Sequence, residues 1–247
     1  MKKVTKKGFT LVELLVVIGI LGILMGALFP VISSAMLSAN LNSMSIQGRK
    51  LIMGIVQANI DRSGKADPVW PKEKDSDTTS SADSQDLDIA SKCGSNKEYF
   101  EALFDMASGN YGTPKWNPAV DGELLSCLWG FGVSGMSGKT LQQENIAWFM
   151  AKNIQDETPD YMPALITRNV DVSQINTYMV TFSGSDPEKP TLGAQHSTPF
   201  SNKGFVLVRK SGAAESMKQS VGTYTAIFQK QSFDNSAANK KLEFMKD

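Results

Sequence analysis

The residues around Glu13 carry the clearest chemistry in this sequence. Residues 7–15 read KGFTLVELL and lead into an apolar run, so Glu13 places a carboxylate where the chain is otherwise suited to lipid. A charge in lipid costs free energy, and ionisable residues in such segments usually have a function. We therefore expect Glu13 to need a cationic partner, and the chemistry predicted for it is ion pairing.

The apolar run covers residues 14–32 and consists mostly of Leu, Ile, Val, Met, Ala and Gly. As an α-helix it would be about 28 Å long, close to the hydrocarbon thickness of a bilayer. It is preceded by four lysines, Lys2, Lys3, Lys6 and Lys7. Because lysines favour the cytoplasmic side, we expect a single span with a cytoplasmic N-terminus.

Three kinds of N-terminal segment fit this pattern. A secretory signal peptide would be cut near residues 33–35, and the mature chain would begin at Met36. A plain membrane anchor would stay uncut, whereas a prepilin-type leader would be cut between Gly8 and Phe9. The first two account for the lysines and the hydrophobicity, but neither accounts for Glu13 or for a Gly followed by Phe-Thr-Leu.

The KGFTLVELL segment resembles the cleavage and methylation motif of type IV pilins and type II secretion pseudopilins, in which Gly, Phe and Glu hold a fixed spacing before an apolar run. The resemblance covers about residues 1–60. It implies that a prepilin peptidase, an aspartyl enzyme of the membrane, cuts after Gly8 and methylates the new amino group of Phe9. It also implies an inner-membrane platform protein and, indirectly, a cytoplasmic assembly ATPase as partners.

Cleavage would give Phe9 an α-ammonium group that is largely cationic at neutral pH. In a stack of identical helices, Glu13 could reach Phe9 of a neighbouring copy or of its own chain. We expect this pair to set the register of assembly, because a paired charge is far less costly in lipid than an unpaired one.

The apolar run contains three glycines and a proline. Gly19, Gly22 and Gly26 would let neighbouring helices approach closely, and Pro30 removes one backbone hydrogen bond. We expect a helix kink at Pro30. The same pattern also fits an ordinary membrane helix that is tightly packed.

Beyond Pro30 the sequence becomes amphipathic, and we predict one helix from about Phe9 to Asp61. The predicted organisation is a leader at 1–8, a long helix at 9–62 with its membrane or filament-core segment at 14–32, and a globular head at 63–247. The stripe expected to face the head has spacings of three and four residues and consists of Leu37, Leu41, Met44, Gly48, Leu51 and Ile55, widened by Ile52, Val56 and Ile60.

Charge and cysteine content limit the function classes. The chain has 25 basic and 25 acidic residues, and loss of the leader's four lysines would leave 21 against 25, a net charge of −4. No basic patch interleaved with aromatics is present, so we expect no nucleic-acid partner. Export would place Cys93 and Cys127 in an oxidising compartment, which favours a disulfide between them; two buried free thiols are the alternative.

We expect no cofactor and no metal. The polar segment 72–92 contains six acidic residues and reads as an exposed loop. The alternative for this segment is a calcium-binding site, because hard cations bind clustered oxygen atoms. The spacing of these acids, however, fits no EF-hand loop.

For the head we predict an α+β fold, with short helices and a mostly antiparallel sheet of about four strands that packs on the long helix. Capping-box patterns predict helices after Ser95 and Thr140, the second including residues 146–150, and a short helix or turn is expected at 124–129. Strands are predicted at 164–167, 177–183, 204–210 and 223–230.

Enzyme signals are weak. Residues 130–135 match G-x-G-x-x-G, but no βαβ pattern surrounds them, and His196 is the only histidine. We therefore expect no enzyme but a structural filament subunit, held in the bacterial inner membrane before assembly into a periplasmic or cell-surface filament. The alternative is a minor, tip-located pilin whose head is a binding module for adhesion or substrate recognition.

Overall fold

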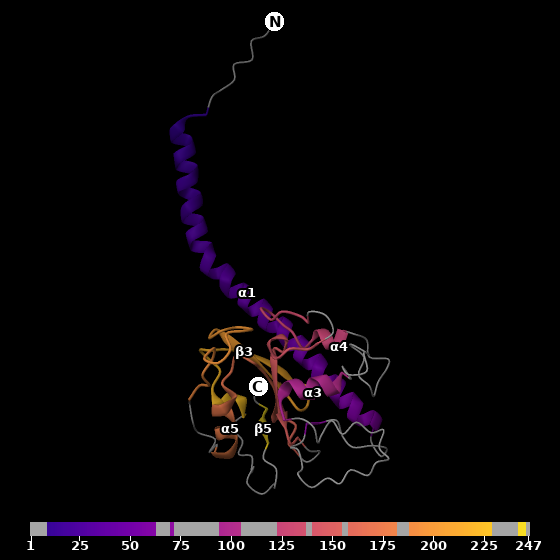
Figure 1. Ribbon diagram of the computed structural model, residues 1–247. Helices are drawn as coiled ribbons and strands as arrows, with labels where there is room; N and C mark the ends of the chain where they lie inside the picture. The colour runs from indigo at the N-terminus through magenta and orange to yellow at the C-terminus, as the bar shows by residue number, and fades with distance from the viewer. Residues whose placement is uncertain are drawn as a thin grey trace. The chain divides into compact units, whose positions relative to one another are not determined.

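The computed structural model describes residues 9–62, 70–71, 94–104, 123–136, 140–154, 158–181, 188–228 and 242–245. By its internal contacts the chain divides into two compact units, Met1–Asn40 and Leu41–Asp247. The first unit holds the apolar part of one long helix. The second holds the rest of that helix and an α+β head, which confirms the fold class expected from the sequence (Figure 1).

The long helix α1 extends from Leu11 to Arg62 and is continuous through Pro30. Both ends lie within two residues of the prediction. The helix leaves its apolar first part exposed, whereas its second part buries one face in the head. Sequence and structure therefore agree that this single helix has two different environments.

A five-stranded antiparallel sheet forms the centre of the head, where about four strands were expected. Its order is β4-β3-β2-β1-β5, and every pair of neighbouring strands is antiparallel. The register places Ile166 opposite Phe149 on one side and opposite Leu207 on the other. The strands are β1 (Trp148–Lys152), β2 (Pro163–Thr167), β3 (Gly204–Arg209), β4 (Ala214–Lys218) and β5 (Glu243–Phe244).

Short helices join these strands. The α-helices of the head are α3 (Asn96–Leu103), α4 (Glu123–Ser126), α5 (Val172–Thr181) and α6 (Tyr224–Ile227), and a 3₁₀ helix, η2, covers Gln143–Asn145. The cap predicted for α3 is present, since the Glu98 amide donates to Ser95 Oγ over 3.3 Å. The short helix predicted near Leu124 is α4.

A glycine lets α1 approach the sheet closely. An added Cβ at Gly48 would lie 2.6 Å from the ring of Trp148 on β1 and 2.7 Å from a methyl group of Val208 on β3. A side chain at this position would therefore force the helix and the sheet apart. The helix residues buried around this contact are Leu41, Met44, Leu51, Ile52, Ile55 and Ala58.

At one end of the sheet, the side-chain amides of two asparagines form hydrogen bonds with backbone groups of the strands. Asn96 is buried and Asn176 is half-buried. Asn96 donates to the carbonyl of Trp148 and accepts from the amide of Met150 over 3.0 Å, on the part of β1 that β5 does not reach. Asn176 makes the same pair of bonds to Phe244 of β5, at 2.9 and 2.7 Å. Each amide side chain thus makes the two hydrogen bonds that the backbone of a neighbouring strand would otherwise make.

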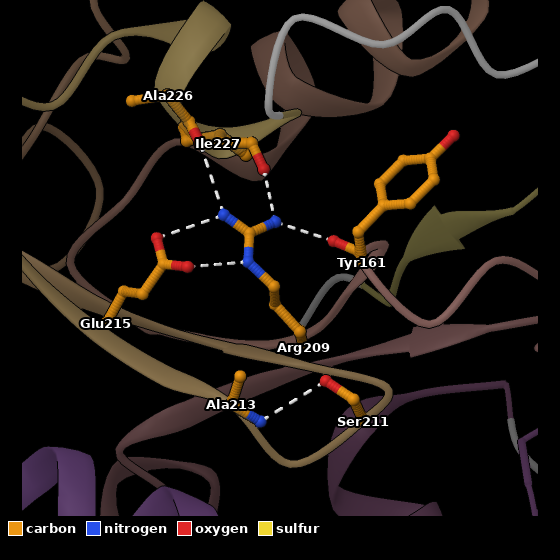
Figure 2. A network of polar contacts seen from close by, with 7 residues as sticks. All are labelled: Tyr161, Arg209, Ser211, Ala213, Glu215, Ala226 and Ile227. Atoms are coloured by element: carbon orange, nitrogen blue, oxygen red, sulfur yellow. Dashed lines mark hydrogen bonds and ion pairs between the residues drawn. The ribbon is translucent and has the colours of Figure 1, made fainter.

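A buried guanidinium ties the other end of the sheet to α6 (Figure 2). Arg209, at the end of β3, bonds both carboxylate oxygens of Glu215 on β4, at 2.7 and 3.0 Å. It also donates to the carbonyls of Tyr161, Ile227 and Ala226 over 2.6, 2.8 and 3.2 Å. All five N–H donors of this side chain therefore have a partner.

The structure corrects three of the predicted elements. Residues 148–150 lie in strand β1 and not in a helix, and the predicted strands at 177–183 and 223–230 give way to α5 and α6 over their described residues. Short apolar runs of this length can form either a helix or a strand, and tertiary contacts decide which of the two is formed. Strands β4 and β5 had not been predicted, since both are short and partly polar.

Candidate functional site: the N-terminal motif and Glu13

The described chain begins next to the predicted cleavage position. Gly8 lies outside the described residues, so the structure gives no geometry for the Gly8–Phe9 bond. Phe9 is 74% exposed and directly precedes the first turn of α1, in which Glu13 lies. The two residues that cleavage would turn into a charged pair are therefore one helical turn apart.

Thr10 and Glu13 form a capping box at the start of α1. The amide of Thr10 donates to Glu13 Oε2 over 2.9 Å, and the hydroxyl of Thr10 donates to the same oxygen over 2.8 Å. In return, the amide of Glu13 donates to Thr10 Oγ1 over 3.3 Å. This reciprocal arrangement satisfies backbone donors that the first turn of a helix leaves without partners.

The capping box gives Glu13 a second role beside ion pairing. Its carboxylate accepts two hydrogen bonds and lies at the positive end of the helix dipole, where an acid is stabilising. Hydrogen bonds leave the charge itself in place, and no ion pair to Glu13 is found among the described residues. The site thus presents a fixed carboxylate whose charge is open to an external cation.

Thr10 is the residue that the sequence analysis missed. Thr10-Leu11-Val12-Glu13 has the T-x-x-E spacing of a capping box, which is a helix-start signal in its own right. In the structure Thr10 fixes the position of the Glu13 carboxylate.

The helix behind the motif is the one described helix long and apolar enough to cross a membrane. A signal sequence would meet the same test of length and composition. An added Cβ at Gly19, Gly22 or Gly26 would meet nothing within 4 Å, so each glycine leaves open space on the helix surface. The helix carries Pro30 without a break, and the Ser33 hydroxyl donates to the Pro30 carbonyl over 2.9 Å.

The other predicted site residues lie in the head. Cys127 is buried, and its carbonyl accepts a hydrogen bond from the Trp148 indole over 2.8 Å. Cys93 and the acidic segment 72–92 lie outside the described residues. Within the described part of the chain, no three His, Cys, Asp or Glu side chains are grouped so that they could hold a metal.

The glycine-rich stretch 130–135 is a turn and not a phosphate-binding loop. It follows helix α4, whereas a dinucleotide site would follow a strand. Phe131, at its tip, is 52% exposed and stacks on the buried Phe200 with ring centroids 6.0 Å apart. The ring of His196 lies 6.0 Å from that of Phe149, in a partly buried position.

Comparison with known proteins bears on the N-terminal segment. Residues 4–29 match the family model described as the prokaryotic N-terminal methylation motif, the hallmark of type IV pilins and pseudopilins. This motif, followed by the long apolar helix, supports a type IV pilin-like or pseudopilin-like protein. No curated protein and no solved structure matched the chain.

The motif also indicates a broad role for the chain. It implies processing by a prepilin peptidase and assembly into a filament, and it points to a structural subunit and not to an enzyme. The apolar helix that follows agrees with a membrane-anchored pilin.

Proposed function

We propose that this protein is a structural subunit of a type IV pilus-like filament or a type II secretion pseudopilus. The observation that carries the proposal is the capped carboxylate of Glu13, one turn from Phe9 at the head of an exposed apolar helix. An acid held in this place has no evident use in a simple anchor or in a discarded signal peptide. It has a use where a new amino terminus must be recognised.

Cleavage is the first step of the proposed mechanism. Prepilin peptidase hydrolyses the Gly8–Phe9 bond, which leaves a carboxylate on Gly8 and an amino group on Phe9. Methylation of this amine keeps its positive charge. The cation then lies next to Thr10, whose side chain and amide already hold Glu13.

Assembly is the second step. The membrane stores the subunit with its lysine-rich end in the cytoplasm, and a platform protein driven by an assembly ATPase extracts it. Glu13 of the incoming copy pairs with the Phe9 ammonium of a neighbour, because two charges that face apolar surroundings are stable only together. The growing filament carries the heads into the periplasm or to the cell surface.

Intact mass of the mature chain tests this proposal. We expect a polypeptide that begins at Phe9 and carries one methyl group. A chain that begins at Met36 would show a cleaved signal peptide, and a chain that keeps residues 1–8 would show an uncut anchor. Either result would overturn the filament role.

One observation favours a second role as a minor subunit at the filament tip. Phe131 projects from a tight turn, and its ring is supported by the buried Phe200. A rigid exposed aromatic ring is typical of contact surfaces. The copy number separates the two roles, because a major subunit dominates purified filaments and a tip subunit is nearly absent from them.

A further inference from the structure

Two exposed apolar side chains of the head lie at the same end of its sheet. Outside α1, the large apolar side chains that the described head exposes are those of Phe131 and Val221, at 52% and 66%. Scattered single residues of this kind need no explanation, but residues that gather in one place mark a contact surface. The positions of these two residues therefore need to be compared.

A series of contacts joins the two side chains. The ring of Phe131 stacks on that of Phe200, whose carbonyl accepts a hydrogen bond from the Lys203 amide over 3.1 Å. Strand β3 begins at the next residue, which lies opposite Lys218 of β4. In the turn after β4, the Val221 amide donates to the Lys218 carbonyl over 2.9 Å. Both exposed side chains thus belong to one end of the β3–β4 pair.

This end of the head is the end at which α1 joins it. An added Cβ at Gly204, the first residue of β3, would lie 3.4 Å from the side chain of Leu41, where the buried core begins. An added Cβ at Gly130 would overlap the sulfur of Met44, one turn further along α1. We name the surface at this end the entry face, and it consists of Phe131, Lys203, Lys218 and Val221.

The entry face carries positive charge without a matching acid. Lys203 and Lys218 are exposed, and neither forms an ion pair with another residue that the structure describes. At the opposite end of the same strands, Arg209 and Lys210 each have a carboxylate within 4 Å, at 2.7 and 3.9 Å. The unpaired cations of the β3–β4 pair therefore lie on the entry face.

A third lysine lies at the rim of this face. Lys189 Nζ donates to the carbonyl of Ser220, next to Val221, over 2.9 Å. Glu188 precedes this lysine and is the one acid in the described segments 188–190, 201–204 and 217–222, which contain three lysines. These segments together have a net charge of +2 (three minus one).

The position of Leu41 in the sequence brings the entry face close to a membrane. Leu41 follows Ile32, the end of the apolar run, by nine residues, over which α1 rises by about 14 Å. The headgroup region of a bilayer is about 5–8 Å thick on each side. Anionic headgroups attract lysines over a further Debye length of about 8–10 Å. The connection of the chain alone therefore keeps this face within reach of the headgroups.

We propose that the entry face lies on the headgroups of an anionic bilayer while the subunit is stored in the membrane, an inference that rests on the membrane-stored state of the proposed function. The lysines bind lipid phosphates, and Phe131 and Val221 lie among the headgroups, as apolar side chains of membrane-surface segments do. A bilayer accounts for the cations, the two apolar side chains and their place beside Leu41 together. Extraction of the subunit breaks this contact and leaves Phe131 available to other partners.

Photo-crosslinking of the full chain in vesicles tests this contact. The probe is p-benzoylphenylalanine at position 131 or 221, and the matched control is the same amino acid at position 213, which is exposed at the opposite end of β3 and β4. The vesicles contain phosphatidylcholine alone or an equal mixture with phosphatidylglycerol. Mass spectrometry of the irradiated chain detects a covalently attached phospholipid.

We expect phospholipid adducts from positions 131 and 221 in the mixed vesicles, and none from position 213. Lys203→Glu should lower the adduct yield at position 221 by about fivefold or more, because each lysine near an anionic surface strengthens binding by about this factor. Lys97→Glu changes the net charge equally on α3 and should leave the yield unchanged. In phosphatidylcholine alone, the yield should fall to a level that Lys203→Glu no longer lowers.

Other results would contradict the lipid contact. Equal adduct yields from positions 213 and 221 would show that the head touches lipid without a preferred face, and crosslinks to a second copy only would show that the face binds protein. Flotation of the wild type with the vesicles reports on insertion of α1. A wild type that floats but gives no adducts would overturn this inference alone. A wild type that does not float would also remove the membrane-stored state, and the proposed function with it.

Discussion

At the scale of single residues, Thr10 and Glu13 show how one carboxylate serves two purposes. The capping box fixes the carboxylate by local hydrogen bonds, and these bonds form within one turn of one chain. The charge that they leave is then available to the amino terminus of another copy. A helix cap alone would need no acid, because glutamine can serve at the position of Glu13 in a capping box as well.

Substitution at these two positions separates the two purposes. Glu13→Ala should lower filament assembly by about tenfold or more, because the neighbour's ammonium group loses its counter-charge. Thr10→Ala keeps the charge and loses only the cap, so we expect a loss of about threefold. Both are measured as sedimented filament relative to the membrane pool. Equal effects of the two substitutions would show that the cap, and not the charge, governs assembly.

Arg209 is the second residue whose loss has a defined consequence. Arg209→Met would remove the hydrogen bonds that Arg209 donates to three backbone carbonyls and to the Glu215 carboxylate. We expect the free energy of unfolding to fall by about 3 kcal/mol, at the lower end for a broken buried pair because Glu215 is partly exposed. Urea unfolding of the purified subunit measures this change.

A surface pair provides the control for Arg209. Lys97 lies 3.5 Å from Glu101, and both side chains are about one-third exposed. Lys97→Met should change the stability by less than about 1 kcal/mol, because exposed ion pairs contribute little. A similar loss in both variants would contradict a special role for Arg209.

At the scale of elements, β1 connects the two segments that carry the cysteines. Trp148 donates its indole N–H to the carbonyl of Cys127, and its own carbonyl accepts a bond from Asn96, three residues after Cys93. Cys93 itself lies outside the described residues, so the disulfide between Cys93 and Cys127 stays a prediction from the sequence.

The disulfide has a direct chemical test. The denatured but unreduced mature protein should fail to react with a maleimide, and reduction should then expose two thiols. The bond would close a loop of about 35 residues and stabilise the head by about 4 kcal/mol. Reaction of two thiols without a reductant would show that both cysteines are free.

At the scale of the whole molecule, the exposed apolar segment of α1 and the buried core lie in different parts of the sequence. Among the described residues, the buried core begins at Leu41, and every residue from Phe9 to Met36 is exposed. The exposed apolar surface of this first part is suited to lipid or to other helices.

Removal of the first part should leave the head intact. A chain that begins at Ser33 should be soluble, and its free energy of unfolding should lie within about 1 kcal/mol of that of the full subunit in detergent. The buried Trp70 and Trp148 provide the fluorescence signal for this comparison. An unfolded product would show that the head depends on the apolar segment.

Much of this molecule could be predicted from local patterns. The motif at Gly8, Phe9 and Glu13, the long helix and the cap of α3 all depend on residues within one or two turns of each other, so the sequence alone determines them. The α+β class follows from the same patterns. Even Thr10 had a local signal, the T-x-x-E spacing.

Only the tertiary structure decided whether the short apolar runs form helices or strands, and which residues of α1 are buried. Residues 148–150 pair with β2 and are fully enclosed, which makes them a strand, whereas Thr223 caps a helix where a strand had been predicted. Ile55 and Ile60 have the same side chain, yet one is buried and the other is 62% exposed. Contacts between residues distant in sequence make this choice, because they remove one side of the helix from water and leave the other free.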